Sequence, residues 1–237
     1  MVEPNLVCLR VRRASSISRA LPGYHSRSTS FEPGVKRWVM SLKFRGPDAL
    51  AGTILGELPK SEAFKNLCRR LYEAGTGRAA TEAKFYQVLR CLQGRAGQTR
   101  SWYFHYDSYV VTALLPVAIP SEGPRGDLLI IPNTRHIRRL YLTNLLDKLL
   151  IENRFAQAVL RSITRRRRFN TVSIQLQPGN IYLFWGYRSI HTNEACDPDK
   201  LRATALFHYG NPHRDSRLRR LIQKRSAANT APDLVEV

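Results

Sequence analysis

The sequence predicts a mainly β protein with flanking helices, an α+β fold with a β-sandwich or barrel at its core. From residue 101 onward apolar and polar residues alternate with period two, and turn residues divide this region into about seven short apolar runs. Helical spacing of apolar residues is concentrated before residue 101 and in one later segment. Helices that precede and interrupt a set of strands are typical of a sheet supported from outside. With 237 residues, of which 43% are hydrophobic, the chain can bury one such core.

Two helices are predicted before the strands. The first lies between Ser61 and Gly75, where apolar side chains recur every three or four residues. The second is predicted to begin at Thr81. Its apolar stripe consists of Phe85, Leu89 and Leu92. We therefore expect residues 46–100 to form a helical support beside the core.

A core of short strands is predicted over residues 101–212, followed by a basic C-terminal helix and tail at 213–237. The strands are expected at residues 101–119, 127–131, 172–176, 181–185, 189–192 and 201–209. A helical insertion at 134–168 divides them. Its helix, over roughly residues 136–163, carries an apolar face of leucines and is followed by the arginines at 165–168.

The chain carries a large excess of positive charge. Its 38 Lys and Arg residues against 18 Asp and Glu residues give a net charge of +20. The excess surrounds the predicted strands: residues 135–170 hold ten basic and two acidic side chains, whereas 101–134 hold one and three, and 171–212 hold three of each. Such a field attracts anions, which include nucleic acid, acidic membrane surfaces and carboxylated or phosphorylated substrates.

A transmembrane span and a disulfide framework are both excluded by the sequence. The longest apolar stretch, 109–120, is interrupted by Thr112 and Pro116 and is far shorter than the ~20 residues that cross a bilayer. The four cysteines lie far apart without a CxxC pair, so a cysteine zinc site is not indicated either. Isolated thiols favour a reducing compartment, and we expect a cytoplasmic protein.

Residues 1–45 are expected to form a basic, poorly ordered arm. From Arg10 to Phe31 arginines alternate with serines and no acidic residue occurs, a pattern that is typical of an organelle transit peptide. A disordered basic arm, or translation that starts at Met40, would explain the same composition. The sequence alone leaves these readings of residues 1–39 open.

Three side chains suited to holding a metal ion stand out. His105 and Asp107 are two residues apart, so on a strand both project from the same face. His191 follows a predicted hairpin and can supply a second imidazole. Two histidines and one carboxylate bind Fe(II) or a similar ion on one face and leave the other positions open for substrates.

Arg202 and Thr204 are predicted to bind a carboxylate. They follow His191 on the next predicted strand and share one face of it. A guanidinium binds a carboxylate through a bidentate fork, and a hydroxyl adds one hydrogen bond. His208 shares this face, and the sequence leaves open whether it is structural or points into a cavity.

These residues lie in motifs that resemble the Fe(II)- and 2-oxoglutarate-dependent oxygenases. The motifs are HYD at 105–107, GDLL at 126–129, QPGNIYLFW at 177–185, His191, and RAT at 202–204. The resemblance implies a double-stranded β-helix, a jelly-roll variant, with His105, Asp107 and His191 as the iron ligands. It also implies that Arg202 pairs with the distal carboxylate of 2-oxoglutarate and that Thr204 stands beside this arginine.

The function that this resemblance implies is that of a dioxygenase, most simply a hydroxylase. Such an enzyme couples oxidative decarboxylation of 2-oxoglutarate to oxidation of a substrate C–H bond. It requires Fe(II), 2-oxoglutarate and O2, and ascorbate is expected to stimulate it. The positive charge favours an anionic small molecule or a protein as the unidentified substrate.

Three alternatives stay open at this point. Nucleic-acid demethylases of the same fold carry a second arginine six residues after the first, but that position is His208 here, so a nucleic-acid substrate is not favoured. A non-catalytic jelly-roll module would bind nucleic acid or acidic surfaces through its basic periphery. A cupin-like metalloenzyme would use the metal without a 2-oxo acid, and Arg202 would then be structural.

Overall fold

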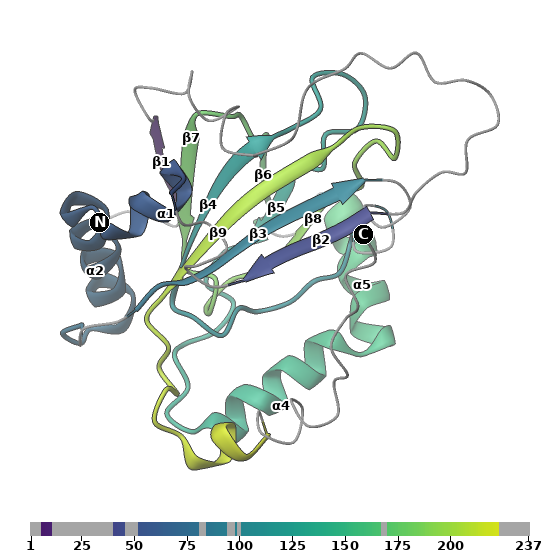
Figure 1. Cartoon of the computed structure of the whole chain (residues 1–237). Helices are drawn as coiled ribbons and strands as arrows, with labels where there is room; N and C mark the ends of the chain where they lie inside the picture. Colours follow the sequence, from purple (N-terminus) through teal and green to yellow (C-terminus); the bar gives the residue numbers. More distant parts are fainter. Residues whose placement is uncertain are drawn as a thin grey trace.

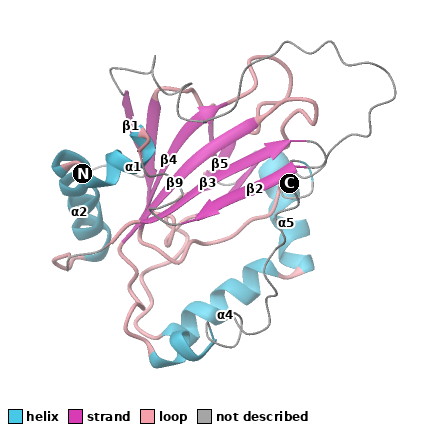
Figure 2. Cartoon of the chain, in the orientation of Figure 1, coloured by secondary structure: helices cyan, strands magenta, loops and turns pink. Residues whose placement is uncertain are grey.

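The computed structural model describes residues 6–10, 40–45, 52–80, 84–93, 98, 101–166 and 170–222. Within this part, two antiparallel sheets form the centre and the helices lie outside them (Figures 1 and 2). The strands are β1 (Leu6–Arg10), β2 (Met40–Arg45), β3 (Tyr86–Gln93), β4 (Val111–Ala118), β5 (Leu128–Ile131), β6 (Val172–Ile174), β7 (Asn180–Phe184), β8 (Ile190–Asn193) and β9 (Arg202–Tyr209). The helices are α1 (Ile54–Glu57), the 3-10 turn η3 (Leu58–Lys60), α2 (Glu62–Thr76), α4 (Tyr141–Glu152) and α5 (Arg154–Arg165), with a short helical segment at 217–222.

The major sheet has six strands in the order β1-β7-β4-β9-β3-β2, and the minor sheet has three in the order β6-β5-β8. Strands that are distant in sequence are therefore neighbours in space, as in a jelly roll rather than a simple meander. The minor sheet is extended by an isolated antiparallel bridge between His105 and His191. The expected β core with flanking helices, a double-stranded β-helix, is confirmed.

Residues of the major sheet alternate between two environments. On β9, Ala203, Ala205 and Phe207 belong to a core cluster with α1 and α2 on the outer side of the sheet. Leu206 and His208, on the opposite face, line a cavity between the two sheets. Because successive strand residues point to opposite faces, one strand thus serves the outer core and the interior site at the same time.

The inner faces of the two sheets pack on one another beside this cavity. The cluster between them contains residues of β4, β5, β6 and β7 and of the segment after β6, namely Leu114, Leu128, Ile130, Ile174, Leu176, Tyr182 and Phe184. Cross-sheet packing of this kind fixes the separation of the sheets, and hence the position of side chains that each sheet presents inward.

Helix α2 is docked on the outer face through an indole. Trp185 Nε1 donates a hydrogen bond to the carbonyl oxygen of Leu71 at 2.9 Å. A Cβ at Gly75 would lie 2.6 Å from the same nitrogen, so the helix approaches the ring closely only because position 75 is glycine. Trp185 immediately precedes Gly186, which belongs to the site described below, so this contact also positions the site.

The insertion between β5 and β6 consists of two helices, not of the single helix predicted over residues 136–163. Asn153 separates α4 from α5 because its backbone is extended and its side-chain oxygen accepts a hydrogen bond from the amide of Ala156 at 2.9 Å. Arg135 ties the insertion to the core: its guanidinium lies over the rings of Tyr106 and Tyr187 and pairs with Asp147 of α4 at 3.0 Å.

The helix predicted to begin at Thr81 is wrong. Residues 86–93 form strand β3 of the major sheet, between β2 and β9. Leu89 and Cys91 face the outer core while Val88 lines the interior cavity, so the strand is apolar on both faces and its residues also fall at helical spacing. The support expected over 46–100 is therefore helical only in part, and the sheet extends beyond 101–212.

Several other expectations concern the ends of the chain and the strand edges. Within the arm expected at 1–45, β1 pairs with β7 and β2 with β3, while residues 1–5 and 11–39 lie outside the described residues. Of the region 101–119, only 111–118 is a strand. The C-terminal helix is described over 217–222 and the tail after it is not.

In the described part, no helix is long and apolar enough to cross a membrane.

We expect Gly75→Ala to destabilise the fold, although alanine is the better helix former by about 1 kcal/mol. The added methyl group would collide with the Trp185 ring, and overpacking of this kind costs about 1–3 kcal/mol. Urea denaturation measures the free energy of unfolding. The exposed neighbour provides the control, because Ala74→Gly should cost only the helix-propensity difference. An increase in stability for Gly75→Ala would contradict the close packing.

Candidate metal centre

The structure brings His105, Asp107 and His191 together. One ligand atom of each residue lies within 4.8 Å of the corresponding atoms of the other two. His191 Nε2 is 3.4 Å and His105 Nε2 is 3.9 Å from the oxygens of the Asp107 carboxylate. Three side chains separated by up to 86 residues thus converge on one point, with the donor set that suits a divalent metal such as iron.

The two histidines are positioned by each other's backbone. The amide of His105 donates to the carbonyl oxygen of His191 at 3.1 Å, and the amide of His191 donates to the carbonyl oxygen of His105 at 3.1 Å. Residues paired in this way are directly opposite across a ladder and place their side chains on the same face. The imidazole rings accordingly lie 4.4 Å apart between centroids.

Both imidazoles are held in the tautomer that a metal ligand requires. His105 Nδ1 lies 3.1 Å from the carbonyl oxygen of Tyr103, and His191 Nδ1 lies 3.1 Å from that of Ser189. A carbonyl oxygen can only accept, so in the neutral ring each Nδ1 carries the proton and each Nε2 keeps a lone pair. The Nε2 atoms face the carboxylate of Asp107, and the Nδ1–H bonds to carbonyl oxygens are the contacts that typically orient metal-bound histidines.

Asp107 is fixed from the opposite side by three residues. Its amide donates to the carbonyl oxygen of Gly186 at 3.0 Å, and a Cβ at Gly186 would collide with the carboxylate. Thr112 Oγ1 donates to Asp107 Oδ2 at 2.5 Å. Since the hydroxyl proton is used there, His208 Nδ1, at 3.1 Å, donates to the same hydroxyl oxygen. The carboxylate can therefore keep one orientation.

Burial and neighbouring charges act in opposite directions on the pKa values of the cluster. Burial, together with His191, lowers the pKa of His105 to about 4, so this imidazole is neutral at pH 7. Burial alone would lower the pKa of His191, but the adjacent Asp107 carboxylate raises it. For Asp107, burial alone would raise the pKa, yet His191 and His208 hold it well below its usual range. The aspartate is thus ionised and available to a cation.

A cavity of about 210 Å³ opens in front of the cluster. It is lined by His105, Asp107 and His191 on one side and by apolar residues of both sheets on the other. His208 is part of the wall, which settles the question that the sequence left open for it. Tyr86 and Tyr109 stack on each other, and the His208 ring stacks on Tyr109 at 5.4 Å between centroids.

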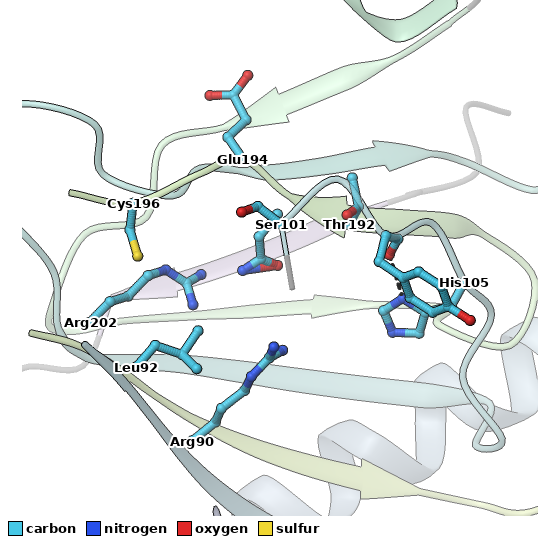
Figure 3. A pocket seen from close by; sticks show the side chains of 10 residues that line it. Arg90, Leu92, Ser101, His105, Thr192, Glu194, Cys196 and Arg202 are labelled. Atoms are coloured by element: carbon cyan, nitrogen blue, oxygen red, sulfur yellow. Dashed lines mark hydrogen bonds between the residues drawn. The ribbon is translucent and has the colours of Figure 1, made fainter. Parts of the chain in front are cut away.

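Arg202 lies in a second, smaller pocket that adjoins the first. Both pockets are lined by Arg90, His105 and Asn193, so the metal cluster and the guanidinium face one continuous interior. Figure 3 shows Arg90 and Arg202 pointing into the pocket, with His105 at its other end. Arg202 is almost completely buried, at 1% exposure. Burial lowers its pKa to about 10, so it remains charged at pH 7.

The guanidinium of Arg202 is held by groups of the protein. Its Nη2 donates to the carbonyl oxygen of Gly126 at 3.1 Å, and the side-chain oxygen of Asn193, turned toward it, accepts from Nη2 and Nη1 at 2.5 and 3.1 Å. A Cβ at Gly126 would lie 2.7 Å from Nε, which explains the glycine of the GDLL motif. Nε is buried without a hydrogen-bond partner in the described part of the chain.

The remaining predicted site residue, Thr204, is buried two residues further along β9. It lines neither of the two pockets. Its role beside Arg202 therefore stays a prediction. Arg90, which lines both pockets, was missed by the sequence analysis because it lies on the strand that the helical spacing concealed. Thr112 and Gly186 were missed because nothing in the sequence connects them to Asp107.

We expect Thr112→Val to weaken metal binding. The substitution keeps the shape of the side chain but removes the hydrogen bond to the Asp107 carboxylate, and loss of such a supporting contact costs about 10–100-fold in metal affinity. Anaerobic titration with Fe(II) or Co(II) measures the dissociation constant. Thr112→Ser retains the hydroxyl and should bind nearly as the unsubstituted chain does. Equal affinities for the valine and serine variants would contradict the positioning role.

Solved structures share this architecture. Neither a protein-family model nor a curated protein matches the sequence. HygX from Streptomyces hygroscopicus, with nickel and 2-oxoglutarate bound, is 11% identical with a TM-score of 0.52, over 87% of this chain and 82% of that one. EctD from S. alaskensis, with bound Fe, is 16% identical with a TM-score of 0.51, over 87% and 72%. Such identities are evidence of fold alone: the chain has the double-stranded β-helix fold of the Fe(II)- and 2-oxoglutarate-dependent oxygenases that its motifs resemble.

Proposed function

We propose that the protein is an Fe(II)- and 2-oxoglutarate-dependent dioxygenase, most simply a hydroxylase. The observation that carries the proposal is the convergence of two Nε2 lone pairs and an ionised carboxylate at one end of an interior that has a buried arginine at the other. HygX, which shares the fold, binds nickel and 2-oxoglutarate, and EctD binds Fe. A cluster and a cationic pocket in one cavity are what a metal-chelating diacid requires.

The residues of the cluster fit an iron ion. His105, Asp107 and His191 would hold it, because their donor atoms already face one point and both imidazoles are in the tautomer that leaves Nε2 free. When bound, iron with 2-oxoglutarate and O2 supplies the oxidising chemistry for a C–H bond, with succinate and CO2 as by-products. The part played by the protein is to hold the ligands on one face and leave the opposite face open to the cavity.

Arg202 would bind the distal carboxylate of 2-oxoglutarate. Its unpartnered Nε and its charge in a buried site are both suited to a carboxylate. The pocket in front of it measures about 20 Å³, which is room for one water. It is small because the side-chain amide of Asn193 is hydrogen-bonded to the guanidinium. A diacid that reaches from the cluster to Arg202 would displace this amide. Thr204 and Arg90 are the neighbours that we propose to assist it.

The substrate would enter the cavity in front of the cluster. Its walls combine apolar side chains with the aromatic rings of Tyr86 and His208. The positive charge of the chain favours an anionic small molecule or a protein as substrate. A nucleic-acid substrate is not favoured, because His208 stands where demethylases of this fold have a second arginine and is engaged with Thr112.

We propose the cytoplasm as the compartment. Three cysteines of the described part, Cys68, Cys91 and Cys196, are free thiols and are buried. Free thiols of this kind persist in a reducing environment. The Arg/Ser-rich segment that would direct the chain to an organelle lies outside the described residues.

Incubation with Fe(II), 2-oxoglutarate, O2 and ascorbate should yield succinate, faster when a substrate is added. His105→Ala and Asp107→Ala are expected to abolish both stoichiometric Fe(II) binding and succinate formation. His136→Ala, at an exposed histidine outside the cluster, is the matched control and should change neither. A chain that binds no Fe(II) in anaerobic titration would leave the non-catalytic module as the better reading.

Arg202→Met should separate the diacid site from the metal site. It is expected to raise KM for 2-oxoglutarate at least about tenfold, because a charge-assisted bidentate contact is lost, while the affinity for Fe(II) stays unchanged. Steady-state kinetics of succinate formation and anaerobic titration measure the two quantities. Turnover that is unaffected by Arg202→Met would favour the cupin-like alternative without a 2-oxo acid.

A further inference from the structure

The outer face of helix α4 is a stripe of exposed leucines. Leu142, Leu146, Leu149 and Leu150 follow the spacing i, i+4, i+7, i+8, which places them on one side of the helix. Each is at least half exposed, and Leu150 reaches 66%. Leu140, just before the helix, is exposed to a similar degree. Apolar residues that are scattered singly on a surface need no explanation, but a continuous stripe indicates an interaction site.

The inner face of the same helix is mainly polar, with Ile151 packed on the core beside the polar groups. Asp147 pairs with Arg135 and Arg138, and Lys148 donates to the Ser108 hydroxyl at 2.9 Å. Asn144 is buried on this side. In a helix that serves only to complete a core, the apolar stripe faces inward. Here the polar face anchors the helix and the apolar face is left for another surface.

Helix α5 also carries exposed apolar residues. Phe155, at the start of α5, is 81% exposed, and Val159 lies one turn further on the same side. Both helices lie on one side of the sheets, at the periphery of the molecule (Figure 1). We call the exposed apolar residues 140, 142, 146, 149, 150, 155 and 159 the leucine ridge.

Basic side chains border the leucine ridge. Arg139 and Arg154 are exposed beside the two ends of α4, and Arg166 is exposed just after α5. Arg161 and Arg165 contact Trp102 on the core side of α5 instead. Residues 135–166 contain only two acidic residues, of which Asp147 is paired with arginines on the inner face. The ridge therefore carries apolar and cationic groups together.

We propose that the leucine ridge docks on the surface of an anionic phospholipid bilayer. Leucine and phenylalanine on one side of a helix, with arginines beside them, suit the boundary between acyl chains and acidic headgroups. Each basic residue close to such a surface contributes about 1 kcal/mol. A second copy of the chain is a poor occupant, because it would bring two strongly basic segments together. An acidic protein would need a groove that receives the ridge, and only the outer side of these helices is accessible because the inner side is packed on the core.

The docking proposal is independent of the proposed chemistry, since the leucine ridge contains no residue of the metal cluster or the arginine pocket. It does bear on access to the site. Lys148, on the inner face of α4, is bound to Ser108, the residue next to Asp107. A membrane-bound ridge would hold the reaction site near the headgroups, where amphipathic substrates are concentrated.

Flotation of the full chain with phospholipid vesicles tests the proposal. Vesicles of phosphatidylcholine with about 30% phosphatidylserine should bind the chain, and binding should fall as salt is raised. Leu146→Ser with Leu149→Ser is expected to weaken binding at least about tenfold, because two apolar side chains no longer enter the bilayer. Ile54→Ser with Val172→Ser is the matched control at exposed aliphatic residues outside the ridge and should bind as the unsubstituted chain does.

Charge is tested separately from apolar contact, because the whole chain is basic. Arg139→Gln with Arg154→Gln should weaken binding about tenfold or more, whereas Arg70→Gln with Arg78→Gln, at exposed sites near α2, should weaken it much less. Equal binding by the leucine variant and the unsubstituted chain would overturn the proposal, since general charge would then suffice. A dimer in light scattering that Leu146→Ser with Leu149→Ser dissociates, without vesicle binding, would assign the ridge to a second copy instead.

Discussion

The site depends on one pair of backbone hydrogen bonds, those that join His105 to His191. They connect a loop that precedes β4 to the strand β8, and they place both imidazoles on one side of the minor sheet. Asp107 is then within reach because its own amide is bound to Gly186, in the turn between β7 and β8. Three ligand atoms thus acquire a fixed geometry from main-chain pairing, which is more rigid than side-chain contacts alone.

The polar interior is tolerated because the charged groups of the site have hydrogen-bond partners. Burial of an arginine or an ionised carboxylate is costly unless hydrogen bonds and opposite dipoles compensate. Thr112 and His208 compensate Asp107, and Gly126 and Asn193 compensate Arg202. The stability for this arrangement comes from the outer face of the same strands, where apolar residues of β4 and β9 pack on α2. Strand alternation allows both roles in one sheet.

The helices of the insertion contact the core in a different way from helix α2. They are attached to the core through polar contacts, above all between Arg135 and Asp147, and through the apolar side chains of Ile151 and Leu160. Most leucines of α4 are left outside, while in α2 the apolar residues face the sheet. One fold therefore presents two kinds of helix, one that completes the core and one that offers its apolar side to a further surface.

Local patterns in the sequence were sufficient to single out the three side chains that converge in the cluster, the β core and most of its strands, because two-residue spacing on a strand and turn residues are local signals. They were insufficient for β3, whose Leu89 and Cys91 pack outward while Val88 faces inward, so that burial on both faces imitates helical spacing. Only the tertiary structure could place Gly186 against Asp107 or Arg90 beside Arg202, because those contacts join segments that are distant in sequence. Thr112 and Asn193 are closer to Asp107 and Arg202 along the chain, but only the structure shows which way their side chains turn. It also decided that the leucines of α4 point outward, since the same apolar stripe is compatible with either direction until the polar partners of the opposite face are known.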